Sequence, residues 1–109
     1  MRRTFIETSV FQRTWKDAGL NDDDLAALEN MLLTDSQAGN VIPHLDGGRK
    51  VRDPLDGHGK SGGARVIYVD VVVREQIYLL LAYPKNVQTD LTPEQKKVLR
   101  SLIKRLKEE

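Results

Sequence analysis

The first third of the chain has the hydrophobic spacing of two helices. One apolar stripe at i, i+4 and i+7 follows a possible N-cap at Thr8 or Ser9, and a second stripe follows Asn21–Asp24, whose aspartates suit the positive end of a helix dipole. The stripes consist of Phe11, Trp15 and Ala18, and of Leu25, Leu28, Met31 and Leu32. The pattern predicts a short strand over Arg2–Glu7 and then a helical hairpin that ends at Gly39-Asn40.

After residue 40 the pattern changes to that of strands. Two long apolar runs, Arg65–Val73 and Gln76–Pro84, are joined by the polar Arg74-Glu75, which predicts a β-hairpin at the centre of a sheet. Shorter strand pieces are expected at Val41-Ile42 and Lys50–Asp53, on either side of a turn. The tyrosines of the long runs, which are expected in the core with hydrogen-bonded hydroxyls, are Tyr68, Tyr78 and Tyr83.

The final segment starts with a helix-capping sequence. Thr92 can act as the cap, Pro93 suits the first helical position, and Gln95 stands three residues after the cap. The expected buried stripe consists of Val98, Leu99, Leu102, Ile103 and Leu106. The order β-α-α-β-β-β-α predicts one α+β domain over residues 1–109, with an antiparallel sheet, an N-terminal helical hairpin and a C-terminal helix.

Composition narrows the class of protein. A length of 109 residues suffices for one domain with one modest core. No apolar run approaches the roughly 18 residues of a membrane span, and Met1–Ile6 lacks the apolar stretch of a secretory signal. Because the chain has no cysteine, it has no disulfide framework and no thiolate chemistry. We therefore expect a cytoplasmic protein that does not contact a membrane.

Positive charge is concentrated in two segments. The net charge is only +1, but residues 49–65 carry 5 basic and 2 acidic side chains, and residues 92–109 carry 6 and 3. Residues 1–48 are acidic, with 4 basic and 8 acidic side chains. A near-neutral chain with two basic segments favours a local site for a polyanion over general coating of nucleic acid. The last helix also fits a simpler role, in which its lysines only face water.

The candidate chemistry lies between Gly47 and Tyr68. Glycines there allow the backbone to approach a ligand closely, and cations can bind phosphate. The basic side chains of this stretch are Arg49, Lys50, Arg52, Lys60 and Arg65, with His58 in the glycine-rich loop. Antiparallel pairing of the strands on either side of the loop would bring these cations together, and Lys85 at the end of the next strand could join them.

Two other kinds of site do not fit the sequence. Gly59-Lys60-Ser61 resembles part of a nucleotide-binding phosphate loop, but Pro54 stands where the first glycine is required, and a strand follows instead of a helix. Metal ligands would have to come from His44 and His58 without any cysteine. We therefore expect two solvated histidines and no metal site.

Several motifs along the chain have the spacing of one known family. They are Phe5, Phe11 and Trp15, Gly19-Leu20, Asp35 with Gly39–Ile42, Gly47–Arg52, Gly59–Tyr68, and Tyr83–Asn86 followed by Asp90-Leu91-Thr92. Together they resemble the RelE/ParE superfamily of toxins, most closely its HigB-like branch, over nearly the whole chain. The glycine-rich core with the later Lys-Asn and Asp-Leu-Thr segments is the most specific part.

The resemblance implies a toxin of a type II toxin–antitoxin module. Such a toxin would be a ribosome-dependent mRNA endoribonuclease, an mRNA interferase that inhibits translation and arrests growth until a cognate antitoxin neutralises it. It would act on ribosome-bound mRNA without a metal or small-molecule cofactor. Its fold would be a small curved antiparallel sheet with helices packed against it.

The resemblance also assigns site residues by motif. The catalytic positions correspond to Arg65, Lys60 and Lys85, and the phosphate-binding positions to Arg49, Lys50, Arg52 and Asn86. Better-known relatives carry an arginine where this chain has Asn86, and a tyrosine in the final segment where it has Leu91 or Thr92. The general base therefore stays open. Histidine titrates near neutral pH, which makes His58 one candidate, and a lysine beside another cation is a second.

Two other functions fit the same fold. A ParE-like toxin that binds a topoisomerase without cutting nucleic acid needs no phosphate-binding cluster, so the charges of residues 49–65 weigh against it. A non-catalytic RNA-binding protein, or a co-repressor partner of an antitoxin, would keep the cluster without the cleavage.

Overall fold

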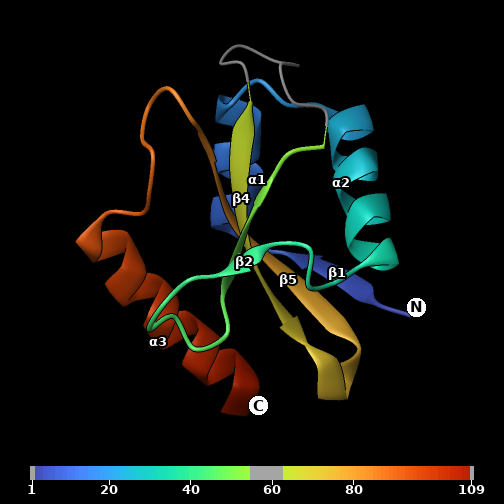
Figure 1. The fold of residues 1–109 in the computed structure, drawn as a ribbon, viewed down its shortest axis with the longest axis vertical. Coiled ribbons are helices and arrows are strands. Elements are labelled where there is room, and N and C mark those ends of the chain that lie inside the picture. The colour runs from blue at the N-terminus through green and yellow to red at the C-terminus, as the bar shows by residue number, and fades with distance from the viewer. Residues whose placement is uncertain (1, 55–62, 109) are drawn as a thin grey trace.

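The computed structural model describes residues 2–54 and 63–108, which Figure 1 shows as a ribbon. In chain order the elements are β1 (Thr4–Glu7), α1 (Ser9–Asp17), α2 (Asp22–Thr34), β2 (Asn40–Val41), β3 (Arg49–Arg52), β4 (Ala64–Val71), the 3₁₀ turn η1 (Val72–Arg74), β5 (Gln76–Pro84) and α3 (Pro93–Glu108). The α+β class, the helical hairpin and the C-terminal helix are confirmed. The described residues form four strands after the hairpin, near the four predicted strand pieces, and the first of them, Asn40–Val41, pairs with β3; the predicted order β-α-α-β-β-β-α counts one strand fewer.

The strands form one sheet in the order β1-β5-β4-β3-β2. The last four strands of the chain pair antiparallel, as predicted, but β1 runs parallel to β5, with Thr4 beside Gln76. The sheet is therefore mixed, and the prediction of an antiparallel sheet is wrong only for the pairing of β1. A parallel pair needs a long connection, and the elements between β1 and β5 provide it. The pattern of a four-residue strand does not indicate its direction.

The helical hairpin starts where the polar residues predicted. Thr8 caps α1, because its Oγ1 accepts a hydrogen bond from the Phe11 amide at 3.0 Å and donates one to the Leu80 carbonyl at 3.1 Å. At α2, Asn21 Oδ1 accepts from the Asp24 amide at 2.9 Å, while Asp24 Oδ2 accepts from the Asn21 amide at 2.8 Å. This reciprocal capping box satisfies donors that a helix start otherwise leaves free.

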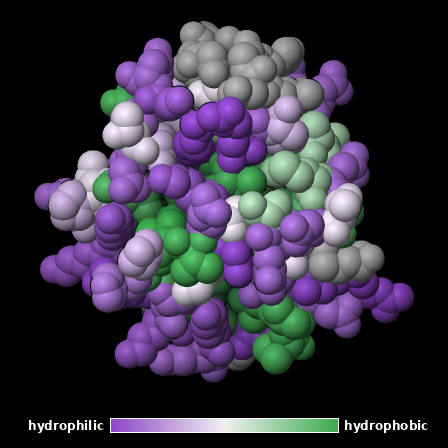
Figure 2. Space-filling view, in the orientation of Figure 1, coloured by the Kyte–Doolittle hydropathy of each residue, from purple (hydrophilic) through white to green (hydrophobic). Residues whose placement is uncertain are grey.

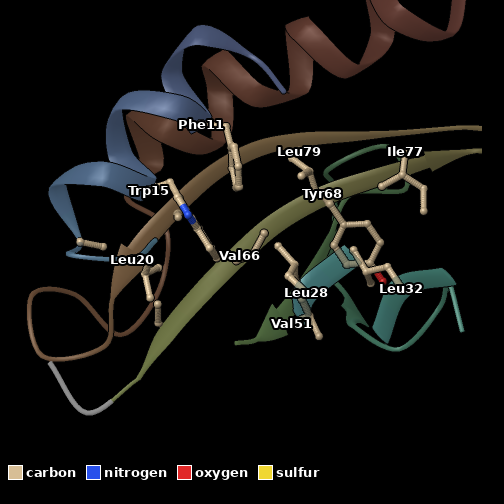
Figure 3. Close-up of a cluster of buried hydrophobic side chains, with 13 residues drawn as sticks. Phe11, Trp15, Leu20, Leu28, Leu32, Val51, Val66, Tyr68, Ile77 and Leu79 are labelled. Carbon is tan, nitrogen blue, oxygen red and sulfur yellow. The ribbon is translucent and has the colours of Figure 1, made fainter. Parts of the chain in front are cut away.

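Helices cover both faces of the sheet. α1 and α2 pack on one face and α3 on the other, so that α2 and α3 lie on opposite sides of the strands in Figure 1. On the α1/α2 face, Phe11 stacks on Trp15 with ring centroids 5.3 Å apart, and Figure 3 shows both side chains directed at the strands. The α3 face buries a second cluster that includes Ile67, Leu99 and Ile103.

The start of α3 matches the prediction, but the buried stripe of the helix is narrower than predicted. Gln95 Oε1 accepts from the Thr92 amide at 3.0 Å, and Thr92 Oγ1 accepts from the Gln95 amide at 3.1 Å. Val98 is 67% exposed, contrary to the prediction, because it lies at a groove between α3 and α1 that Val10 also lines. The face of the molecule drawn in Figure 2 is largely hydrophilic, with smaller hydrophobic areas.

A β-bulge in β5 changes which side chains reach the α3 face. Ile67 pairs with Leu81, but Tyr68 pairs with Leu79, so Leu80 is an extra residue in β5. Leu80 and Leu81 both pack on the α3 face. A bulge of this kind shifts the alternation of every later side chain in the strand. As a result Tyr83 lies on the α3 face, whereas strict alternation from Leu79 would place it on the α1/α2 face.

Candidate active site

The register of β3 and β4 brings three basic side chains to one face of the sheet. Arg52 pairs with Arg65, and Lys50 pairs with Ile67. Ile67 is buried on the α3 face, and side chains alternate along a strand. Lys50, Arg52 and Arg65 therefore share the α3 face, and we call them the cation cluster. Lys50 and Arg65 are half-buried, and Arg52 is exposed.

Two arginines face each other across β3 and β4. Residues directly opposite in an antiparallel pair have Cβ atoms about 4.5–5.5 Å apart, and like charges in such positions repel. Arg52 and Arg65 form such a pair. An anion held between or beside two guanidinium groups removes the repulsion and gains charge-assisted hydrogen bonds. The arrangement therefore suits a phosphate ligand.

Tyr83 extends the row formed by Arg52 and Arg65 onto β5. Its partner across the strands is Arg65, and its side chain is 3% exposed. The hydroxyl oxygen is buried and has no hydrogen-bond partner among the described residues. Burial raises the pKa of Tyr83, as does the negative charge of Asp90, while the positive charge of Arg65 opposes the rise.

Asp90 places a negative charge beside the cation cluster. Its Oδ1 lies 3.7 Å from Lys50 Nζ and accepts a hydrogen bond from the Leu91 amide at 2.8 Å. The Leu91 amide is the main cause of the lowered pKa of Asp90, to which the charges of Lys50 and Lys96 also contribute. The side chain of Asp90 is 56% exposed, so solvent screens this ion pair and an incoming anion can compete for Lys50.

Lys85 and Asn86 follow the end of β5 at the same end of the sheet. The Lys85 amide donates to the Gly63 carbonyl at 3.2 Å, next to the first residue of β4. Both side chains are exposed, in a turn that the amide of Val87 closes by donating to Pro84. The structure thus brings Lys85 and Asn86 to the end of the sheet that carries Arg65.

Arg49 does not join the cation cluster. It pairs with Tyr68, which packs on the α1/α2 face. Its guanidinium donates to the Gly39 carbonyl at 2.7 Å and thereby holds the segment between α2 and β2. The two other predicted site residues, His58 and Lys60, lie outside the described residues.

Two residues of the site were missed as functional candidates. The sequence predicts Tyr83 in the core with a hydrogen-bonded hydroxyl; the side chain is buried, but within residues 2–54 and 63–108 its hydroxyl has no hydrogen-bond partner. Asp90 belongs to the Asp-Leu-Thr motif, and the sequence assigns no separate role to this carboxylate. The sequence feature that marks Asp90 is its position just before the capping sequence Thr92–Gln95, in the segment that joins β5 to α3.

The described residues offer no metal site. Within residues 2–54 and 63–108, no three or more histidine, cysteine, aspartate or glutamate side chains are grouped closely enough to hold a metal ion. His44 is exposed, and its carbonyl accepts a hydrogen bond from Arg100 Nε at 2.6 Å.

Within residues 2–54 and 63–108, no helix is long and apolar enough to cross a membrane.

Comparison with known proteins identifies the family. Residues 2–109 match the family model described as "RelE toxin of RelE / RelB toxin-antitoxin system". The chain belongs to the RelE toxin family. The family implies that this RelE-family toxin has an antitoxin partner, and the predicted resemblance to the RelE/ParE superfamily is confirmed.

A solved structure supports the same fold for this RelE-family toxin. This chain is similar to the solved structure of an E. coli toxin RelE mutant in its free state, in which two arginines are replaced by alanine. The TM-score is 0.57 and the sequence identity is 12%. The match covers 82% of this chain and 90% of the E. coli chain. At this identity the likeness extends to the fold and not to individual side chains.

The buried tyrosines predict a loss of stability at alkaline pH. Burial is the main cause of the raised pKa of both Tyr68 and Tyr83. In the unfolded chain both titrate near pH 10. Above that pH the unfolded state loses protons that the folded state keeps, so the free energy of unfolding should fall as pH rises from about 10 through the folded pKa values.

Urea titrations on either side of pH 10 measure this loss. Tyr83→Phe should retain more of its stability over the alkaline range than the wild type, because it removes one of the two shifted groups. A wild-type free energy of unfolding that stays constant through the alkaline range would contradict the prediction.

Proposed function

We propose that this RelE-family toxin is a metal-independent endoribonuclease that cuts mRNA on the translating ribosome. The observation that carries the proposal is the pairing of Arg52 with Arg65, beside Lys50, on one face of the sheet. Such a cluster suits the closely spaced phosphates of a single RNA strand, which arginine binds with two donors and lysine with a point charge. A toxin that acts only by binding a protein has no need of it.

Arg65 is the first choice for stabilising the transition state. Without a metal, RNA can be cleaved by its own 2′-hydroxyl, which attacks the adjacent phosphorus while the bond to the 5′-oxygen breaks. The protein must accept the 2′ proton, stabilise the negative phosphorane and supply a proton to the leaving oxygen. Arg65 lies on β4, which is held on both sides by β3 and β5, so its guanidinium is anchored on a rigid element that can present two donors to the phosphorane.

The other assigned residues bind phosphate or move protons. Lys50, Arg52 and Asn86 would bind the RNA backbone, and Lys85 and Lys60 would bind phosphate or transfer a proton. Asp90 is a weak base because its pKa is lowered by the Leu91 amide and by Lys50. The proton acceptor is therefore His58 or one of the lysines.

The antitoxin and the ribosome are the partners of this proposal. A cognate antitoxin would neutralise the toxin by covering or distorting the cation cluster. The ribosome would supply mRNA held in an extended conformation. A ParE-like toxin remains the alternative, and a non-catalytic RNA-binding protein is a further one.

Mapping of mRNA ends after brief expression tests the cleavage. We expect new 5′ ends within coding sequences, in phase with codons. The purified protein should leave naked mRNA mostly intact and cut the same mRNA during translation in vitro. Efficient cutting of free RNA would contradict the dependence on the ribosome. DNA damage without RNA cuts would favour the ParE-like alternative, and neither effect would favour a non-catalytic protein.

A further inference from the structure

Among the three tyrosines of β4 and β5, only the Tyr83 hydroxyl has no hydrogen bond to the part of the chain that the structure describes. The Tyr68 hydroxyl donates to the Ser36 carbonyl at 2.8 Å and accepts from the Gly39 amide at 3.0 Å. The Tyr78 hydroxyl donates to Gln76 Oε1 at 3.0 Å. The Tyr83 hydroxyl is as inaccessible as a core group but has no such partner among the described residues.

A hydroxyl in this state is unfavourable for the fold. A buried polar group that gives up water without gaining a hydrogen bond destabilises the folded protein, whereas phenylalanine would fill the same space without that loss. Residues that reduce stability without a structural benefit are expected at functional sites. The Tyr83 hydroxyl therefore suggests a partner that is present only when a ligand binds.

The surroundings of the hydroxyl indicate the charge of that ligand. Tyr83 faces Arg65 across the strands, and the charges of both Arg65 and Asp90 affect its ionisation. A tyrosine hydroxyl keeps its proton at neutral pH, and burial raises the pKa of Tyr83 further, so the hydroxyl can donate a hydrogen bond. A protonated donor opposite Arg65, on the sheet face that also carries Lys50, suits an anion.

We propose that the Tyr83 hydroxyl donates a hydrogen bond to a phosphate oxygen of RNA bound at the cation cluster. The inference rests on the proposed endoribonuclease function. In the free protein Asp90 holds Lys50, with Nζ and Oδ1 3.7 Å apart, and an RNA phosphate that binds Lys50 replaces this carboxylate. Displacement of Asp90, which belongs to the exposed segment after β5, gives the phosphate access to the enclosed hydroxyl.

Tyr83→Phe separates this role from a structural one. We expect single-turnover cleavage of ribosome-bound mRNA to slow by about 10- to 100-fold, the usual effect of losing a hydrogen bond to a charged group. The melting temperature should stay equal to that of the wild type or rise, since an unpaired buried hydroxyl is removed. A role in stability alone would change the rate only together with the melting temperature.

Tyr78→Phe is the matched control on the same strand and the same face. It removes a hydroxyl whose partner is Gln76, so cleavage should proceed at the wild-type rate. Wild-type cleavage by Tyr83→Phe would overturn the role of Tyr83, as would a loss of rate that follows a fall in melting temperature. The two proposals fail separately: a wild-type protein that cuts no mRNA overturns the endoribonuclease, whereas equal cutting by wild type and Tyr83→Phe overturns only this inference.

Discussion

Replacing Arg65 with alanine should lower the rate of mRNA cleavage on translating ribosomes by about 100- to 1,000-fold, the range found when one donor to a developing oxyanion is removed. The same variant should no longer arrest growth when it is expressed. Cleavage of a reporter mRNA in an in vitro translation reaction, followed by primer extension, measures the rate. The fold should persist, because the described hydrogen bond of the Arg65 side chain is a long one of 3.4 Å to the adjacent Ala64 carbonyl.

Two further variants make the Arg65 result specific. Arg65→Lys keeps the positive charge but loses the two-donor geometry, so its rate should fall between those of the wild type and Arg65→Ala. Arg13→Ala removes an exposed arginine of α1, away from the cation cluster, and should cut at the wild-type rate. Undiminished growth arrest by a well-expressed Arg65→Ala would remove Arg65 from the catalytic mechanism.

Phe11→Ala should have the largest effect on stability. The Phe11 side chain is fully buried and stacks on Trp15 between α1 and the sheet. Truncating a buried phenylalanine to alanine costs ~3–5 kcal/mol through lost burial and the cavity that remains. Since domains of this size are stable by only about 5–15 kcal/mol, the variant would lose a large part of its stability. Urea unfolding followed by the fluorescence of Trp15 measures the change.

The adjacent Val10 provides the control for Phe11. It lies on the same helix but is 39% exposed, so Val10→Ala should change the free energy of unfolding by less than about 1 kcal/mol. Equal losses in the two variants would mean that α1 does not pack on the sheet as described.

Local interactions explain which parts of the fold could be predicted. The caps at Thr8, Asn21 and Thr92 involve atoms within three residues of each other, and the period of apolar residues distinguishes helices from strands over a few turns. β5 accordingly occupies the predicted range Gln76–Pro84. The direction of β1 could not be predicted in this way, because it depends on pairing with residues more than 70 positions later.

The candidate site was predictable in composition but only partly in geometry. The sequence indicated that the strands flanking the glycine-rich loop would pair antiparallel, and Arg52 does face Arg65. It did not indicate that Arg49 points to the opposite face, where it binds the Gly39 carbonyl. A shift of one residue in register exchanges the faces of a whole strand, so membership of the cluster depends on a register that the composition leaves undetermined.

By itself the sequence determined the helix starts, the central hairpin and the gathering of basic residues around one loop, because each depends on residue type and short spacing. Only the tertiary structure decided that the Leu80 bulge brings Tyr83 to the face of Arg65, and that Asp90 lies beside Lys50. These positions result from packing between strands and α3 that are distant in sequence. A buried hydroxyl without a partner can be recognised only when the surrounding atoms are known.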